Sequence, residues 1–167
     1  NGQDGYPAFR IPALIATKRG TLLAFAEGRA SLRDHAENDI VLKRSRDNGR
    51  TWGPTQLVQD EWENPTADVW IGNPSPVVDM MDPEHAGRIW LPFTRSNASM
   101  FVTYSDDHGE SWSEPRDVSK TALDPAWGWC AAGPVHAIQL ERGKYKRRLV
   151  IPCDHQQKDA ATSGSHL

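Results

Sequence analysis

One turn motif occurs twice in the chain, and this repeat constrains the fold more than any other feature. Residues 45–52 read Ser-Arg-Asp-Asn-Gly-Arg-Thr-Trp, and residues 105–112, which begin 60 positions later, read Ser-Asp-Asp-His-Gly-Glu-Ser-Trp. Both fit the template S-x-D-x-G-x-[ST]-W. The Asp can accept hydrogen bonds from backbone N–H groups ahead of it, and the Gly supplies a positive φ. We therefore interpret both copies as structural β-hairpin turns, with template residues Ser45, Asp47, Gly49 and Trp52 in the first and Ser105, Asp107, Gly109 and Trp112 in the second.

The segments around the two turns have the pattern of short strands. They are rich in β-forming residues, are bounded by Gly, Pro or Asp, and contain no run of ten residues with helical periodicity. The expected strands are 11–16, 21–27, 39–44, 56–58, 76–78, 87–93, 100–104, 116–118, 136–140 and 147–152. This pattern predicts an all-β fold, a β-propeller of four-stranded antiparallel blades. A β-sandwich is the rival architecture, but the 60-residue period favours the propeller.

The length of 167 residues predicts one domain, of which the repeat accounts for about two and a half blades. Propellers close with about four blades or more. We therefore expect residues 1–167 to be the N-terminal part of a single propeller domain. The expected partner is the remaining C-terminal half, on another chain or in sequence outside this one.

Charge and apolar runs exclude some partners. The chain carries 19 Lys and Arg against 22 Asp and Glu, a net charge of −3, so we expect no nucleic-acid partner. Its apolar runs are too short for a membrane span. Cys130 and Cys153 do not have the spacing of metal ligands, and either a disulfide between them or two buried thiols would fit the sequence. We expect no metal and no cofactor, because Asp34, Glu37 and Asp39 lie on a loop and a strand start without ligand geometry.

Three charged residues near the N-terminus are candidates for chemistry. Arg10 lies in Phe9-Arg10-Ile11-Pro12, just ahead of the first expected strand. Arg29 closes the next strand in Glu27-Gly28-Arg29, and Asp34 follows five residues later in a polar loop. An arginine at the start of a strand is commonly a solvated surface group, so Arg10 alone is a weak signal.

Taken together with the two turn motifs, these residues resemble the opening of the sialidase (neuraminidase) superfamily, and in particular bacterial exo-α-sialidases. The turn motifs match the Asp boxes, or BNR repeats, of that family. The resemblance covers essentially the whole chain, because residues 73–78 resemble the family's second-blade segment, and residues 131–134 with 138–140 resemble a segment entering the third blade. It implies that the complete propeller has six blades.

The resemblance also implies an activity, the retaining hydrolysis of terminal sialic acid from glycoconjugates. Asp34 matches the acid/base catalyst, and Arg10 matches the first of three arginines that bind the sialic acid carboxylate. A guanidinium suits that task because it stays charged and pairs with a carboxylate through two parallel hydrogen bonds. Arg29 is expected on the side of the sugar's 4-hydroxyl. Asn73 falls where the family has a residue that bonds this hydroxyl.

The family's nucleophile is a tyrosine activated by a glutamate, and this pair belongs to the C-terminal half, as do the other two arginines. Tyr6, Tyr104 and Tyr145 are the chain's only tyrosines, and none matches the nucleophile's position. We therefore predict that this chain alone is inactive.

Two other functions remain open at this point. A noncatalytic Asp-box propeller could bind glycans, although it would have no need for Arg10 and Asp34 at this spacing. A trans-sialidase would share every residue named above. The loop 60–70 bears on linkage preference without revealing it. Trp127 and Trp129 fit either an aromatic wall of the site or packing between blades. Asp154 and His155 fit either contact with the ligand or a place on a surface loop. The resemblance implies a secreted or periplasmic protein.

Overall fold

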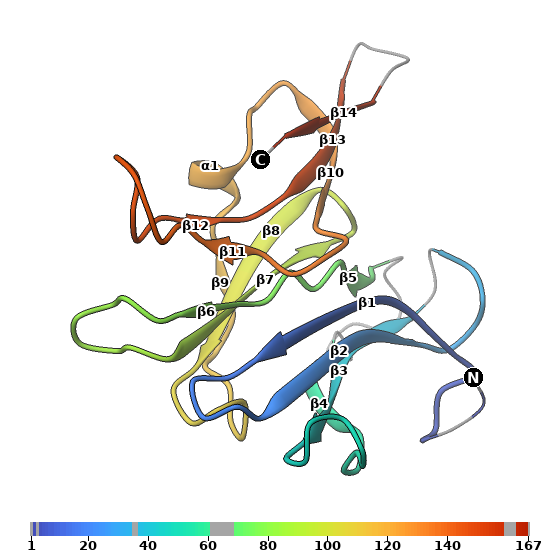
Figure 1. Ribbon diagram of the computed structural model, residues 1–167. Coiled ribbons are helices and arrows are strands. Elements are labelled where there is room, and N and C mark those ends of the chain that lie inside the picture. Colours follow the sequence, from blue (N-terminus) through green and yellow to red (C-terminus); the bar gives the residue numbers. More distant parts are fainter. Residues whose placement is uncertain (1, 3, 35–36, 61–68, 159–162, 167) are drawn as a thin grey trace.

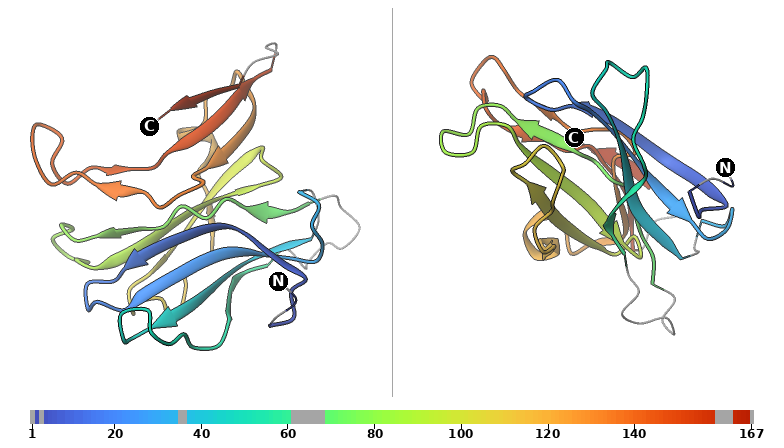
Figure 2. Two further views of the ribbon diagram at one scale, coloured as in Figure 1. Left: turned by 45° about the vertical axis from the view of Figure 1, so that its right-hand side comes forward. Right: turned by 90° about the horizontal axis from the view of Figure 1, so that it is seen from below.

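The chain folds into consecutive antiparallel β-sheets that stack side by side like blades (Figures 1 and 2). The computed structural model describes all residues except 1, 3, 35–36, 61–68, 159–162 and 167. The predicted all-β class is therefore confirmed, with four-stranded antiparallel blades. Most of the loop 60–70 lies outside the described residues.

The first blade is a four-stranded sheet with its strands in sequence order. It consists of β1 (Ala8–Ala16), β2 (Leu22–Arg29), β3 (Asn38–Ser45) and β4 (Gln56–Gln59). Strand β1 begins three residues earlier than expected, so Arg10 lies inside the strand and not ahead of it. The reason is a β-bulge: Ile11 and Pro12 together face the single residue Ala26, and pairing continues on both sides of them.

The second blade has an interrupted inner strand. Both β5 (Ile71–Gly72) and β6 (Val77–Asp79) pair with β7 (Arg88–Arg95), which is followed by β8 (Ser99–Ser105) and β9 (Arg116–Asp117). The break between β5 and β6 contains Pro74 and Pro76, which have no N–H group to donate to a ladder.

The third sheet departs most from the expected strands. The strand β10 (Trp127–Ala132), which the sequence did not predict, pairs with β13 (Cys153–Gln157), and β13 pairs with β14 (Ser163–His166). The expected strands 136–140 and 147–152 shorten to β11 (Ile138–Gln139) and β12 (Leu149–Val150). The only helix in the described part of the chain is α1 (Ser119–Ala122), which is far too short to cross a membrane.

Cys130 on β10 and Cys153 on β13 are free thiols. Burial, with a smaller contribution from nearby Cys153, raises the pKa of Cys130 to about 11. Of the two alternatives left open by the sequence, the structure therefore has the thiol pair, and Cys130 is a weak nucleophile at neutral pH.

The main core lies between the first and second blades. Alternate residues of β1, β2 and β3 point toward the second blade, where they meet side chains of β5 and β7. The fully or nearly fully buried members are Ala13, Ile15, Leu23, Phe25, Ile40, Leu42, Ile71, Ile89, Leu91 and Phe93. Two neighbouring blades thus bury one continuous apolar layer, which fixes how their ends meet.

The two Asp boxes have the same internal hydrogen bonds. In the first, the Asp47 carboxylate accepts bonds from the Thr51 N–H at 2.9 Å and from the hydroxyls of Thr51 and Ser45. In the second, Asp107 accepts the corresponding bonds from Ser111 and Ser105. Both glycines have φ of 83°. These bonds lower the pKa of Asp47 to about 2. Burial of Asp107 by itself raises its pKa, but its hydrogen bonds outweigh burial and lower that value to about 2 as well.

The second Asp box is also docked on the first blade. The carbonyl of Gly109 accepts hydrogen bonds from Arg44 Nη2 at 2.9 Å and Gln56 Nε2 at 3.2 Å. The Trp112 ring packs edge-to-face on Phe25, with 5.7 Å between ring centroids. The first Asp box has no preceding blade in this chain, and its tryptophan, Trp52, is 39% exposed.

We predict a specific loss of stability in acid. A lowered folded-state pKa contributes stability that is present above about pH 4 and lost as the pH falls toward 2. The double variant Asp47→Asn, Asp107→Asn should therefore unfold at a lower temperature than the parent at pH 5, and the difference should shrink by pH 2. Thermal unfolding monitored by circular dichroism across this range measures both.

The control is Glu114→Gln, because the Glu114 side chain is exposed and makes no hydrogen bond in the described structure. If the double variant differs from the parent by the same amount at pH 5 and pH 2, the two carboxylates do not stabilise the turns through their charge.

Candidate active site

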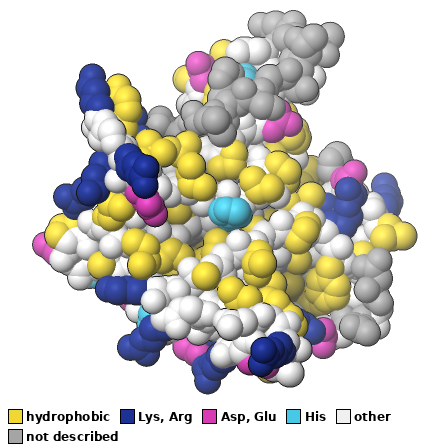
Figure 3. Space-filling model, in the orientation of Figure 1, with side chains coloured by type: hydrophobic (Ala, Val, Ile, Leu, Met, Phe, Trp, Pro, Cys, Tyr) yellow, Lys and Arg dark blue, Asp and Glu magenta, His cyan; other side chains and the backbone are white. Residues whose placement is uncertain are grey.

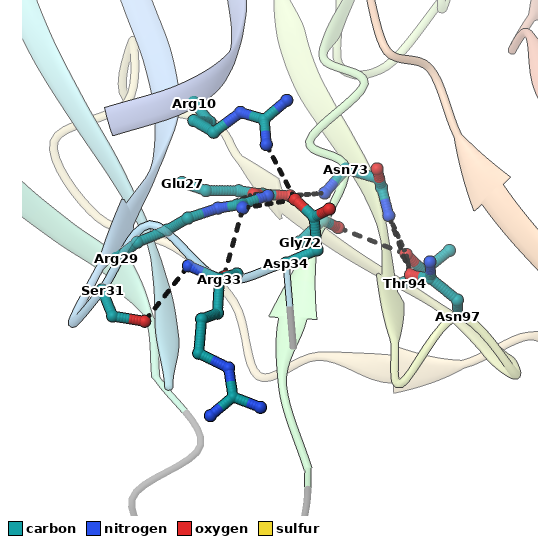
Figure 4. Close-up of polar contacts among 10 residues, drawn as sticks. All are labelled: Arg10, Glu27, Arg29, Ser31, Arg33, Asp34, Gly72, Asn73, Thr94 and Asn97. Atoms are coloured by element: carbon teal, nitrogen blue, oxygen red, sulfur yellow. Dashed lines mark hydrogen bonds and ion pairs between the residues drawn. The ribbon is translucent and has the colours of Figure 1, made fainter. Parts of the chain in front are cut away.

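A cluster of charged side chains lies where the first two blades meet (Figure 4). It is at the end of the strands opposite the Asp boxes. Arg10 comes from the bulged strand β1, Arg29 from the last position of β2, and Asp34 from the loop that follows it. Residues 35–36 of that loop lie outside the described part of the chain. The structure thus brings together three of the four sequence-predicted residues.

The Asp34 carboxylate lies between two guanidinium groups. Its Oδ1 accepts a hydrogen bond from Arg10 Nη1 at 2.7 Å and another from Arg29 Nη1 at 2.8 Å. Arg29 Nη1 also lies 3.4 Å from the carbonyl oxygen of Arg33. Asp34 is nevertheless 69% exposed, so its carboxylate is accessible to a ligand from solvent.

The two arginines differ in burial. The Arg29 side chain is 5% exposed, and that of Arg10 is 49% exposed. Burial alone lowers the pKa of Arg29, but its hydrogen bonds with Asp34 and Glu27 outweigh burial and raise that pKa above its usual value. Arg29 is therefore a fixed, permanent cation inside the protein, and Arg10 is a cation that solvent reaches.

The backbone beside Arg10 is strained. Ile11 has a φ of 52°, a conformation that is unfavourable for a β-branched residue. Bulges often occur next to functional sites, where they redirect a side chain. Here the bulge follows directly after the Arg10–Glu27 pair of the ladder.

Glu27 holds the cluster together, and the sequence analysis assigned it no role. It is 2% exposed, and its Oε2 accepts hydrogen bonds from Arg29 Nε at 2.8 Å and from Arg29 Nη2. Its Oε1 accepts the backbone N–H of Asn73 at 2.8 Å. A signal was available: Glu27 and Arg29 stand two residues apart in a strand, and alternate residues of a strand share a face.

Asn73 joins the cluster through its backbone. Its φ is 57°, and its side-chain Nδ2 donates to Thr94 Oγ1 at 2.7 Å and to Asn97 Oδ1 at 3.0 Å. Gly72 precedes it, and a Cβ atom on Gly72 would collide with the Glu27 carboxylate. The side-chain nitrogen Nδ2 of Asn73 is thus held by residues of the second blade. A hydrogen bond from Asn73 to the sugar's 4-hydroxyl stays a prediction.

The remaining candidates have other surroundings. Tyr6 Oη donates a 2.6 Å hydrogen bond to Asp39, and burial together with this bond raises the pKa of Tyr6. His155 lies within β13 and not on a surface loop. It is 3% exposed and stacks on Trp127 with 4.1 Å between ring centroids. Within the described residues, no three His, Cys, Asp or Glu side chains are grouped to hold a metal ion.

Comparison with known proteins identifies the family. The model of the BNR repeat-like domain family matches residues 20–166. The chain belongs to the sialidase superfamily. An exo-α-sialidase of Aspergillus fumigatus is 32% identical to it over 177 residues, which cover 89% of this chain and 41% of the fungal enzyme. This chain thus spans about two fifths of the length of that relative.

Solved structures agree with the sialidase fold. The Hadza microbial sialidase Hz136 superposes with a TM-score of 0.81 at 28% identity, covering 95% of this chain and 34% of that one. The intramolecular trans-sialidase from Ruminococcus gnavus superposes with a TM-score of 0.72 at 14% identity, covering 96% of this chain and 60% of that one. The second likeness concerns the fold alone.

We predict that Glu27→Ala destabilises the protein by about 3–5 kcal/mol, because it leaves the buried Arg29 without its main counter-charge. Urea unfolding measures the change. The matched control is Arg46→Ala, which breaks the exposed Arg46–Glu110 pair and should cost less than about 1 kcal/mol. A Glu27→Ala loss as small as the control's would show that Asp34 alone suffices to compensate Arg29.

Proposed function

We propose that the protein containing this chain is an exo-α-sialidase, which hydrolyses terminal sialic acid from glycoconjugates with retention of configuration. The observation that carries the proposal is the Asp34 carboxylate held between Arg10 and Arg29 at an exposed edge. Membership of the sialidase superfamily supports the substrate class.

Arg10 is the group that would bind the carboxylate of the sugar. It is half-exposed, and in the structure a single nitrogen, Nη1, bonds Asp34. Its planar fork can pair with a carboxylate through two hydrogen bonds. Arg29 is less available for this task because Glu27 already engages its Nε and Nη2. Arg29 and Asn73 would instead lie toward the 4-hydroxyl of the sugar.

Asp34 would act as acid and then as base. A substrate carboxylate that takes Arg10 removes one cation from Asp34 and brings a like charge near it, and both changes favour the protonated carboxyl. Asp34 then gives its proton to the glycosidic oxygen as the bond to the leaving sugar breaks. In the second step its carboxylate takes a proton from the water that releases sialic acid.

The nucleophile and the other two arginines would come from the remaining part of the propeller. The hydroxyl of Tyr6 is engaged with Asp39, and the ring of Tyr104 lies under Arg88 with 4.1 Å between the guanidinium carbon and the ring centroid. This arrangement supports the proposal that residues 1–167 alone do not catalyse the reaction.

The activity is tested by Asp34→Ala in the full-length protein. On a natural sialoside such as sialyllactose, kcat/KM should fall by about 10²–10⁴-fold, the usual contribution of a general acid. On a fluorogenic aryl sialoside the loss should be much smaller, because that leaving group needs no proton. The control is Arg33→Ala, since the neighbouring Arg33 side chain points away from the cluster in Figure 4.

A folded full-length protein without activity would favour a noncatalytic propeller that binds glycans. Equal losses in the Asp34 and Arg33 variants would remove Asp34 from the mechanism. Product analysis with an added sugar acceptor separates hydrolysis from transfer of sialic acid, which the same residues could perform.

We also propose that another blade packs on the open face of the first blade. The two Asp boxes support this, because Trp112 packs on Phe25 of the preceding blade and Trp52 is 39% exposed. A hollow of about 310 Å³ beside Trp52 is lined mostly by apolar residues, such as Phe9, Pro12 and Val41, with Asp4, Lys43 and Thr55 also in its wall. If the first Asp box packs as the second one does, an aromatic or aliphatic side chain of the neighbouring blade would fill this hollow.

We predict that Trp52→Ala and Trp112→Ala destabilise the full-length protein to a similar extent, by about 3–5 kcal/mol each. Denaturant unfolding of both variants measures this. If the Trp52 face is open to solvent in the full protein, Trp52→Ala will cost much less than Trp112→Ala, and the proposal fails.

A further inference from the structure

The turn between β11 and β12 is a concentrated patch of positive charge. Residues 142–148 read Arg-Gly-Lys-Tyr-Lys-Arg-Arg, which places five cations in seven positions, and all seven residues are exposed. We call this segment the basic hairpin. It projects from the side of the molecule in Figure 1, and dark-blue side chains gather over it at the upper left of Figure 3.

The basic hairpin is an ordered structure. The Leu140 N–H donates to the Arg148 carbonyl at 2.9 Å, and the Arg147 N–H donates to the Leu140 carbonyl at 2.7 Å. Below the turn, Gln139 Nε2 donates to Asp79 Oδ1 of the second blade. Tyr145 stiffens the tip, with Arg148 4.3 Å from its ring centroid. The backbone that carries the charges is therefore ordered.

Several arginines elsewhere in the chain have a carboxylate partner, and these cations have none in the described structure. Arg10, Arg29, Arg44 and Arg88 all pair with carboxylates. Among the described residues, no carboxylate lies within salt-bridge distance of any of the five hairpin cations. Unpaired like charges repel one another, and a bound polyanion would relieve that repulsion.

The net charge of the whole chain hides this patch. The chain carries −3 and the basic hairpin carries +5, so the other residues together carry −8. The expectation of no nucleic-acid partner was drawn from the net charge, which averages over this separation.

We propose that the basic hairpin binds a sulfated polysaccharide chain. A thin, flexible polyanion can contact a protruding turn while it stays beyond the Debye length, about 8 Å at physiological salt, from most of the acidic body. A membrane plane or a nucleic-acid duplex presents a broader negative surface that the acidic residues would repel. In addition, Tyr145, which is 48% exposed, is the only large apolar side chain of the turn, and one ring is little for a lipid surface or for a run of stacked bases.

The hairpin lies at the Asp-box end of the blades, away from Asp34. Its strand β11 adjoins the second blade beside the β6–β7 turn, where Met80 N–H donates to Gln139 Oε1 at 2.8 Å. A bound polysaccharide would leave the Arg10–Asp34 cluster open. The inference is therefore independent of the proposed sialidase activity.

The test is binding of fluorescein-labelled heparin to the full-length protein, followed by fluorescence anisotropy at several salt concentrations. The triple variant Arg142→Gln, Lys144→Gln, Lys146→Gln should bind at least about tenfold more weakly. The slope of log affinity against log salt should fall by about two to three, because three fewer cations displace counterions. The charge-matched control Arg19→Gln, Arg50→Gln, Lys120→Gln removes three exposed cations elsewhere and should change the affinity less than about twofold.

Each contrary outcome overturns the proposal. Equal losses in the two triple variants would mean that overall charge, and not the hairpin, governs binding. No heparin binding by the parent at low salt would remove the site altogether. Tighter binding to phosphatidylserine vesicles or to duplex DNA than to heparin would replace the sulfated polysaccharide by a membrane or a nucleic acid. Hydrolysis of an aryl sialoside should be unchanged in the hairpin variant, which keeps this result separate from that of Asp34→Ala.

Discussion

The buried carboxylate of Glu27 is the interaction on which the site depends. One oxygen binds Arg29 of its own strand and the other accepts the backbone N–H of Asn73 in the next blade. A buried charge is tolerated only when it is paired and its lone pairs are used, and Glu27 meets both conditions. The close approach of Gly72 leaves the carboxylate no space to move. Arg29 is fixed in turn, and it holds Asp34 beside Arg10. The site is therefore a property of two blades together.

Much of the blade architecture could be predicted from the sequence because the Asp box encodes it locally. Asp47 and Asp107 each bind their own turn, so the turn geometry needs no distant partner. The third sheet was predicted less well. The expected strand 147–152 divides because Pro152 cannot donate to a ladder, and pairing resumes at Cys153. Strand β10 contains Trp127, Gly128 and Trp129 in a row, which gives no clear alternation of polar and apolar residues.

The site also contains residues that the sequence predicts and residues that it does not. Arg10, Arg29 and Asp34 could be named in advance because their side chains carry the charge that the chemistry needs, and the structure brings them together. Glu27 escaped prediction because its importance comes from burial and from contact with another blade. The link to Asn73 is a backbone N–H, which any residue except proline could provide, so no side-chain pattern reveals it. The positive φ of Ile11 is equally hidden, because the residue type argues against it.

Some cations of this chain pair with carboxylates, and others have no carboxylate partner in the described structure. The two kinds lie in different places on the blades. At the Asp34 end, Arg10 and Arg29 each meet a carboxylate, and directed hydrogen bonds fix the pairs. At the other end, Arg44 pairs with Glu110 across the two blades, and Arg88 pairs with Asp106 within the second blade. The basic hairpin alone gathers cations without carboxylates, on a turn whose hydrogen bonds do not involve their charged groups. Removing these charges therefore leaves the hairpin's backbone bonds in place, so a variant without them still forms the turn.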